Sequence, residues 1–307
     1  MVRRSTGVRE PGSYYVFDQS TGALTKIIAQ KPDLAPGDLC ADRYFRFASR
    51  DGLPLSGRVT LPRDVRGKPP LVVMIGPYLN GPRARFEFDP AAQFLASRGF
   101  AVARVNVRGT SGLGADILRA GALAITRGMP DDLADAVQWL DQNGLADGGR
   151  TAICSRDWGG LIALGALTRD APFKAWVNFC APLQIPNVGV ENAIVLGRDK
   201  EALIEAAGGR KAFAKYLRAL DPLPLFKTVK IPSFLYYPRD PESGQADWGG
   251  RWVDRTLRKN GTPHVLFIAR KTTRYPADGD EAAEVFGQIV TFLRQYLTPE
   301  TVLEAAK

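Results

Sequence analysis

The distribution of apolar residues along this chain changes at about residue 65. Before that point, short strand-like stretches are separated by Gly-containing turns, which is typical of antiparallel β structure. We expect two strands within residues 14–29 and a second hairpin formed by Tyr44 to Ser49 and Leu55 to Leu61. Residues 1–65 are therefore predicted to be an N-terminal antiparallel β segment.

Beyond residue 65, apolar runs of strand length alternate with helix-like segments. Because continuously apolar strands are buried on both faces, this pattern predicts an α/β fold over residues 66–300, with a mostly parallel, doubly wound sheet and a tail at 301–307. We expect 200–220 to contribute a cap over one sheet edge. The predicted strands are Leu71–Ile75, Ala101–Val107, Thr151–Cys154, Ala175–Phe179, Ser233–Tyr237 and Val265–Ala269. The predicted helices are Pro90–Ser97, Ala115–Thr126, Asp131–Asn143, Gly160–Thr168, Lys200–Leu220, Trp248–Lys259 and Asp280–Leu297.

Composition and charge narrow the function classes. The chain has 307 residues, 45% apolar and 24% charged, as is ordinary for a soluble globular protein. Its net charge of +9 comes from 41 basic and 32 acidic residues, and the basic ones are dispersed without a recognition motif, so we expect no nucleic-acid partner. No apolar run approaches the ~18–20 residues of a membrane span, and the basic N-terminus lacks the apolar stretch of a signal peptide. We therefore expect no membrane partner.

The sequence contains little that would indicate a metal site or a bound cofactor. The three cysteines, Cys40, Cys154 and Cys180, lack metal-ligand spacing, and two of them end apolar runs, which is typical of buried thiols. Asp131 and Asp132 fit a helix N-terminus better than a metal site. We therefore expect no metal and no cofactor.

One segment carries the outline of an active site. Residues 151–162 read Thr-Ala-Ile-Cys-Ser-Arg-Asp-Trp-Gly-Gly-Leu-Ile, which predicts a short strand, a tight turn and the start of a helix. The G-x-S-x-G nucleophile elbow of hydrolases has this strand–turn–helix context, and here Asp157 stands where the serine would be. The chain has one histidine, His264, so a nucleophile at this turn has few general-base partners.

Several segments, in sequence order, resemble the catalytic domain of the prolyl oligopeptidase family of serine peptidases, which includes acylaminoacyl peptidases and dipeptidyl peptidases. The resemblance covers about residues 40–300 and implies an α/β-hydrolase fold. Residues 14–29 resemble the last propeller strands that precede this domain in the peptidases. The segments that carry the resemblance include Ser49-Arg-Asp-Gly52, Phe88-Asp-Pro90, Asn106-Val-Arg-Gly-Thr-Ser-Gly-Leu-Gly114 and Met129-Pro-Asp-Asp132.

The family motif G-x-S-x-G-G falls on residues 155–160. This places Asp157 at the nucleophile position and leaves Ser155 on the strand side, where its hydroxyl is not expected to face the pocket. The family's histidine follows the last strand, where this chain has 270–275, Arg-Lys-Thr-Thr-Arg-Tyr, and no imidazole. His264 precedes the last predicted strand, a run of ~20 Å at about 3.3 Å per residue, and is expected at its opposite end.

The other site positions follow from the same resemblance. The histidine of the family's oxyanion loop is missing from residues 76–82, but the backbone amides of Tyr78 or Leu79, together with that of Trp158, are candidate oxyanion donors. Asp240 falls on the position of the family's aspartate. Without a histidine to orient, we expect this carboxylate to form an ion pair with a neighbouring arginine.

Asp157-Trp-Gly-Gly160 also resembles the elbow of haloalkane dehalogenases and epoxide hydrolases. In those enzymes a carboxylate forms an alkyl ester, which a histidine-activated water then hydrolyses. The missing histidine argues against turnover here too, unless another base such as Lys271 serves. The competing interpretation is a charge pair of Asp157 with Lys271 or Arg274, and such pairs usually mark structure or specificity.

The leading hypothesis is a catalytically degenerate prolyl oligopeptidase-like hydrolase that works as a binding or assembly protein. Its partner would be a peptide or small-molecule ligand in the remnant pocket, a second copy of the chain, or an active paralogue. The alternative is an active hydrolase that uses Asp157 as a carboxylate nucleophile, or one that retains residual peptidase or esterase activity.

Overall fold

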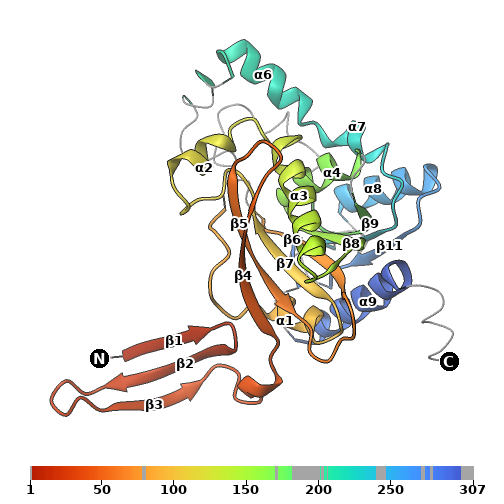
Figure 1. Cartoon of the computed structure of the whole chain (residues 1–307). Coiled ribbons are helices and arrows are strands. Elements are labelled where there is room, and N and C mark those ends of the chain that lie inside the picture. The colour runs from red at the N-terminus through yellow and green to blue at the C-terminus, as the bar shows by residue number, and fades with distance from the viewer. Residues whose placement is uncertain are drawn as a thin grey trace.

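A computed structural model of the chain describes residues 2–77, 81–169, 172–181, 201, 204–205, 207–239, 247–270, 274–276 and 279–298. Its strands form two separate sheets, one of three strands and one of eight. Figure 1 shows the small sheet projecting from one side of the molecule, whereas the large sheet carries helices on both faces. Among the described helices, none combines the length and the apolar run that crossing a bilayer requires.

The small sheet is antiparallel and consists of β1 (Val2–Gly7), β2 (Glu10–Phe17) and β3 (Leu24–Ala29), in that order. The two strands predicted within residues 14–29 are confirmed as β2 and β3. β1 was not predicted, because its sequence, Val-Arg-Arg-Ser-Thr-Gly, contains no apolar run. β3 lies at an edge of this sheet and leaves Leu24, Ile27 and Ile28 exposed.

The large sheet has the strand order β11-β10-β9-β8-β6-β7-β5-β4. β4 is antiparallel to β5 and β5 to β7, and the other neighbouring pairs are parallel, so the mostly parallel sheet is confirmed. The hairpin of β4 and β5 extends this sheet and does not belong to the small one. The strands are β4 (Ala41–Ala48), β5 (Pro54–Leu61), β6 (Pro70–Ile75), β7 (Ala101–Asn106), β8 (Asp147–Arg156), β9 (Phe173–Phe179), β10 (Ser233–Tyr237) and β11 (His264–Ile268).

Helices cover both faces of the large sheet (Figure 1). α1 and α9 share one face, where the rings of Phe94 and Phe286 lie 5.7 Å apart, and α3, α4 and α8 pack on the other. The described helices are α1 (Pro90–Ala96), α2 (Ala115–Ala120), α3 (Gly128–Gln142), α4 (Gly159–Leu167), α6 (Arg210–Ala219), α7 (Pro222–Phe226), α8 (Trp248–Lys259), α9 (Gly279–Leu297) and the 3-10 turn η1 (Pro36–Asp38).

Two of the predicted helices are wrong in extent. The helix predicted over 115–126 ends at Ala120, and Leu123, with a φ of +58°, has a left-handed backbone that no α-helix contains. The helix predicted over 200–220 is interrupted at Gly208 and Gly209, whose φ angles are +84° and +109°, so α6 begins only at Arg210.

The core explains why the central strands are continuously apolar. Leu71, Val72 and Val73, three consecutive residues of β6, are all fully buried, and so are Ala152 and Ile153 of β8. Side chains on both faces of these strands are covered by helices, so neither face can be polar. The carboxyl ends of β6 to β10 meet at one edge of the sheet, which is where α/β folds place their sites.

Candidate functional site

The turn between β8 and α4 has the backbone of a nucleophile elbow. β8 ends at Arg156, and the next residue, Asp157, has a φ of +44°, in the left-handed region that few non-glycine residues adopt. The Asp157 N–H donates to the carbonyl of Phe179 in β9 at 2.8 Å, and its own carbonyl accepts from the Gly160 N–H at 2.9 Å. The predicted strand–turn–helix is confirmed, including the sharp turn that exposes the residue at its apex.

Close packing requires both glycines after the elbow. A Cβ atom on Gly159 would lie 2.4 Å from the carbonyl oxygen of Gly76, and one on Gly160 would lie 2.3 Å from the Cβ of Ala181. Real Cβ atoms do not approach that closely. The glycine pair thus allows α4 to pack against the ends of β6 and β9, whatever chemistry the elbow performs.

The carboxylate of Asp157 is held by an arginine from a distant part of the sequence. Arg274, which lies between β11 and α9, donates from Nε to Oδ1 of Asp157 at 2.6 Å and from a terminal nitrogen to the carbonyl of Cys180 at 3.0 Å. The side chain of Asp157 is 24% exposed and that of Arg274 is 57% exposed. Of the two partners expected for Asp157, Arg274 forms this ion pair, and Lys271 lies outside the described residues.

Of the remaining candidate residues, the structure describes Trp158. Trp158 is the N-cap residue of α4, and its half-buried side chain packs against the core. Tyr78 and Leu79, the candidate oxyanion donors, lie outside the described residues, and so does Asp240, the candidate acid. Their roles stay expectations drawn from the resemblance.

His264 lies far from the elbow. It begins β11, so it is at the amino end of a strand parallel to β8, whereas Asp157 follows the carboxyl end of β8. Three strand spacings of about 4.8 Å and a five-residue strand at about 3.3 Å per residue separate them by roughly 20 Å. The imidazole is paired locally, with Nε2 3.1 Å from Asp254 Oδ1 and Nδ1 2.8 Å from the Thr262 carbonyl.

Ser155, the hydroxyl nearest to the elbow in sequence, belongs to the core. It is fully buried, and its oxygen accepts a hydrogen bond from the indole N–H of Trp176 at 2.9 Å. Successive residues of a strand face opposite sides of a sheet, so Ser155 and Arg156 point in opposite directions. This placement agrees with the expectation that Ser155 does not face the pocket.

The family-like segment 106–114 has a structural role. Arg108 pairs with the fully buried Asp132 at 2.7 Å and with Asp51 at 2.8 Å. α3 begins at Gly128, three residues before Asp131, so the placement of Asp131 and Asp132 at a helix start is approximate, and Asp132 is an ion-pair partner. This cluster ties the β4–β5 turn and α3 to the loop after β7.

Arg156 is a site residue that the sequence analysis missed. Its guanidinium carbon lies 3.6 Å from the ring centroid of Tyr275, a cation–π contact across 119 positions of sequence that no local pattern signals. Arg156 also lines a cavity of about 510 Å³ at the carboxyl ends of β6, β7 and β8. The sequence does not predict the contact with Tyr275, but the position of Arg156 directly before the apex of the elbow could have marked it as a site residue.

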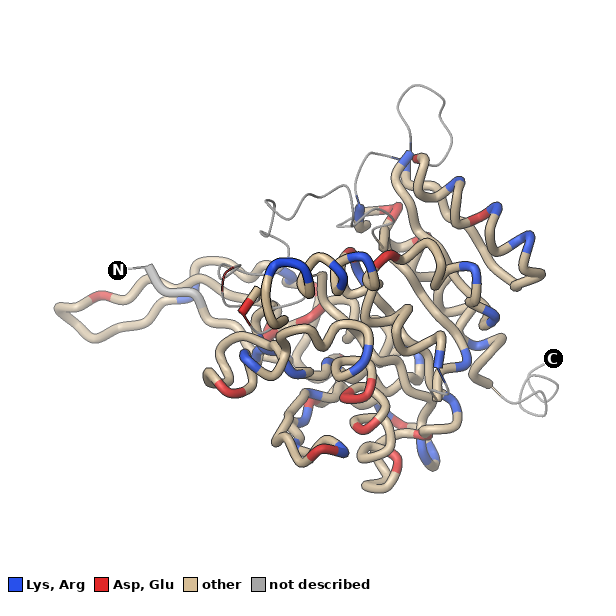
Figure 2. The backbone as a smooth tube through the Cα atoms, turned by 90° about the horizontal axis from the view of Figure 1, so that it is seen from above, with Lys and Arg blue, Asp and Glu red and all other residues tan. Residues whose placement is uncertain are grey.

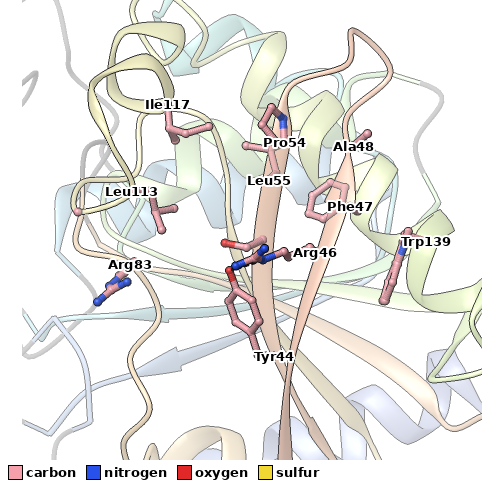
Figure 3. Close-up of a pocket in the computed structure, with 12 residues that line it drawn as sticks. Tyr44, Arg46, Phe47, Ala48, Pro54, Leu55, Arg83, Leu113, Ile117 and Trp139 are labelled. Carbon is pink, nitrogen blue, oxygen red and sulfur yellow. Dashed lines mark hydrogen bonds between the residues drawn. The ribbon is translucent and has the colours of Figure 1, made fainter.

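A second, larger cavity of about 780 Å³ lies away from the elbow. Figure 3 shows it beside the β4–β5 hairpin, where its lining includes Tyr44, Arg46 and Phe47 of β4 together with Leu113 and Ile117. No residue of the elbow lines it. The lining of the larger cavity includes the half-exposed Tyr44 and none of the groups that carry the candidate chemistry. The smaller cavity is therefore the one relevant to the site.

The described part of the chain contains no cluster of metal-ligating side chains. No group of three or more His, Cys, Asp or Glu residues there could hold a metal ion. Figure 2 shows basic and acidic residues interspersed over the strands and helices that are drawn in colour.

Comparisons with known sequences agree with this architecture. Residues 86–194 match the prolyl oligopeptidase family. The chain is 38% identical over 252 residues to dipeptidyl aminopeptidase BIII of Pseudoxanthomonas mexicana, covering 77% of this chain and 36% of the relative. It is 27% identical over 331 residues to dipeptidyl peptidase family member 6 of Caenorhabditis elegans, covering 95% of this chain and 43% of the relative. The chain thus spans less than half the length of either protein.

Solved structures give the same result for the fold. The acylaminoacyl peptidase of Pyrococcus horikoshii has a TM-score of 0.75 and 21% identity, covering 96% of this chain and 48% of that one. A puromycin-hydrolyzing peptidase of Mycobacterium tuberculosis has a TM-score of 0.76 and 21% identity, covering 97% of this chain and 46% of that one. The chain therefore carries a domain of the prolyl oligopeptidase family, with the α/β-hydrolase fold that its sequence motifs predicted.

Proposed function

We propose that this chain is a catalytically degenerate prolyl oligopeptidase-like hydrolase that works as a binding or assembly protein. The ion pair at the elbow carries the proposal. Arg274 holds the side chain at the nucleophile position through a 2.6 Å hydrogen bond and is itself fixed to the carbonyl of Cys180. The carboxylate at the elbow is thus occupied by a partner from its own chain.

The chemistry of a carboxylate supports the same conclusion. Acyl transfer needs a nucleophile, a base that accepts its proton, and donors for the oxyanion. If Asp157 attacked an amide or ester carbonyl, the tetrahedral intermediate would expel the carboxylate in preference to the amine or alkoxide, because the carboxylate is the better leaving group. Asp157 is therefore a poor replacement for the serine of a peptidase.

The position of the one histidine supports the proposal independently. The 307-residue chain has one histidine, which lies roughly 20 Å from the elbow and is paired with Asp254. General-base catalysis requires hydrogen-bond contact or one bridging water, a span of about 3 to 6 Å. A water molecule at the elbow would receive no help from this imidazole.

A peptide is the ligand class that we propose for the elbow face. The similar proteins bear names that denote action on peptides, and the chain carries their type of domain. A second copy or an active paralogue is the assembly partner we would test next. In either case the partner is bound and leaves unchanged.

The test compares reactivity of the wild type and two variants. We expect no labelling of the chain by a fluorophosphonate probe and no cleavage of peptide amides or esters. Activity that disappears in Asp157→Asn or Ser155→Ala would refute the proposal. The rival function, attack by Asp157 on an alkyl halide or epoxide, predicts a stable ester on the Asp157 peptide, since no histidine would activate water to release it. Mass spectrometry after incubation detects that adduct, and its presence would favour the rival.

A further inference from the structure

The cavity beside the elbow contains a cation that the described chain leaves without an acidic partner. Arg156 is half-buried, and its Nε atom is fully buried without a hydrogen-bond acceptor. Within the described residues it forms no ion pair, and its contact is the ring of Tyr275 at 3.6 Å. A cation–π contact contributes about 0.5–2 kcal/mol, and burial of the Nε atom removes part of the hydration of the guanidinium at a cost in free energy. An anion in the cavity would offset this cost.

A second arginine adds an unused donor to the same cavity. Arg104 binds Asp42 at 3.1 Å and Asp89 at 3.6 Å, so its charge is balanced. Its Nε atom is nevertheless buried and has no acceptor. The exposed Arg83 and Arg85 also line the cavity. The described lining thus has four arginines and two acidic residues, one of which, Asp89, already binds Arg104 and caps α1.

Apart from Asn106 and Thr110, the other side chains of the described lining are apolar. Met74, Ile75, Val105, Val107 and Ile162 contribute aliphatic side chains. A cavity of about 510 Å³ falls within the range of roughly 300–1,000 Å³ that is usual for small-molecule sites. Charged donors beside an apolar wall fit a ligand that has both an anionic group and a short apolar part.

We propose that this cavity binds a carboxylate attached to a short apolar group, with the carboxylate on Arg156. Both a free carboxylic acid and the carboxyl end of a peptide have this chemistry, and the planar guanidinium fork suits either. The inference rests on the proposed function only in that the ligand is held and not converted. The site lies directly before the apex of the elbow, on the opposite side of the β8 strand from Ser155.

Isothermal titration calorimetry of the full chain tests the proposal with matched ligands. N-acetyl-leucine represents a peptide end, hexanoate a free acid, N-acetyl-leucinamide the uncharged analogue, and inorganic phosphate an anion without an apolar part. We expect N-acetyl-leucine to bind at least about tenfold more tightly than its amide, because a hydrogen bond to a charged group is worth about 1.5–3 kcal/mol. Tighter binding of hexanoate than of N-acetyl-leucine would assign the site to free acids, and this result would still support the proposed carboxylate site.

Three variants locate the binding. Arg156→Gln is expected to lower the affinity for the carboxylate ligand at least about tenfold. Arg156→Lys keeps the charge and is expected to retain part of that affinity. Arg119→Gln is the matched control, because Arg119 is a 72% exposed arginine on α2 that does not line the cavity. If Arg156→Gln fails to fold, the comparison of acid with amide on the wild type decides alone.

Four results would overturn the inference: equal affinity for the acid and the amide, affinity unchanged in Arg156→Gln, binding of phosphate alone, or no binding of either carboxylate up to about 10 mM. These outcomes are independent of the proposed function. Peptide cleavage by the wild type would refute the proposed function and leave the carboxylate site standing, whereas a missing carboxylate site says nothing about cleavage.

Discussion

A methyl group added to Gly160 tests whether packing fixes the glycine pair of the elbow. In Gly160→Ala the new Cβ would lie 2.3 Å from the Cβ and 3.0 Å from the Cα of Ala181. Ala181 cannot easily move away. Its N–H donates to the Asn178 side chain at 3.1 Å, and its carbonyl accepts from the hydroxyl of Tyr237 at 3.4 Å. α4 must therefore shift, and it packs on the central strands β6 and β8.

The size of the effect follows from the geometry. Forcing an extra methyl group into a well-packed region costs about 1–3 kcal/mol. The control is Gly287→Ala, in the middle of α9, where an added Cβ meets nothing within 4 Å. There alanine should stabilise the helix by about 1 kcal/mol. The same chemical change is thus expected to have opposite signs at the two positions, with a difference of about 2–4 kcal/mol in the free energy of unfolding.

Thermal denaturation of the wild type and both variants in one buffer measures this difference. At about 2 °C per kcal/mol, the midpoints of the two variants should differ by at least about 4 °C, with Gly160→Ala below the wild type and Gly287→Ala above it. A midpoint of Gly160→Ala at or above that of the wild type would refute the packing argument. The glycine would then need another explanation, such as a functional one.

Three further predictions concern the site, the thiols and the acid range. Asp157→Ser should remain unlabelled by a fluorophosphonate probe, because the one histidine lies at the far end of the sheet; labelling would show that another base serves. Burial raises the pKa of the Cys154 thiol to about 12, and the other two cysteines are buried as well, so Ellman's reagent at pH 8 should react with the three thiols only after unfolding. Hydrogen bonds from Arg108 and Ser49 hold the pKa of Asp51 below its usual range. A depressed carboxyl pKa stabilises the folded state above the unfolded value of about 3.9, so the stability advantage of the wild type over Asp51→Asn should be present at pH 7 and shrink as the pH falls below about 4, measured by urea denaturation at both pH values.

The apolar pattern predicted the regular elements well where burial alone decides them. The bounds predicted for Ser233–Tyr237 and Trp248–Lys259 are those of β10 and α8, because a run buried on both faces and a strongly amphipathic helix each have a clear signature. The errors lie where single backbone angles decide. Leu123, with its left-handed φ, ends the predicted helix early, and leucine gives no sign of that conformation in sequence.

The site was predictable only in part. The motif placed Asp157 at an elbow, and the resemblance directed attention to the loop that contains Arg274, so this contact between distant residues was expected. The cation–π contact of Arg156 with Tyr275 was not, and neither was the cavity that Arg156 lines. A cavity depends on how a loop packs over the ends of three strands, and no periodicity in the sequence records that.

The exposed edge of the N-terminal sheet has a consequence for handling the protein. Leu24, Ile27 and Ile28 of β3 are 57–59% exposed, and β3 is an edge strand of its sheet. An edge strand with aliphatic side chains offers unpaired backbone groups and an apolar surface to a second molecule, which favours intermolecular strand pairing. The colloidal behaviour of concentrated solutions is therefore expected to depend on residues 24–29, independently of anything that happens at the elbow.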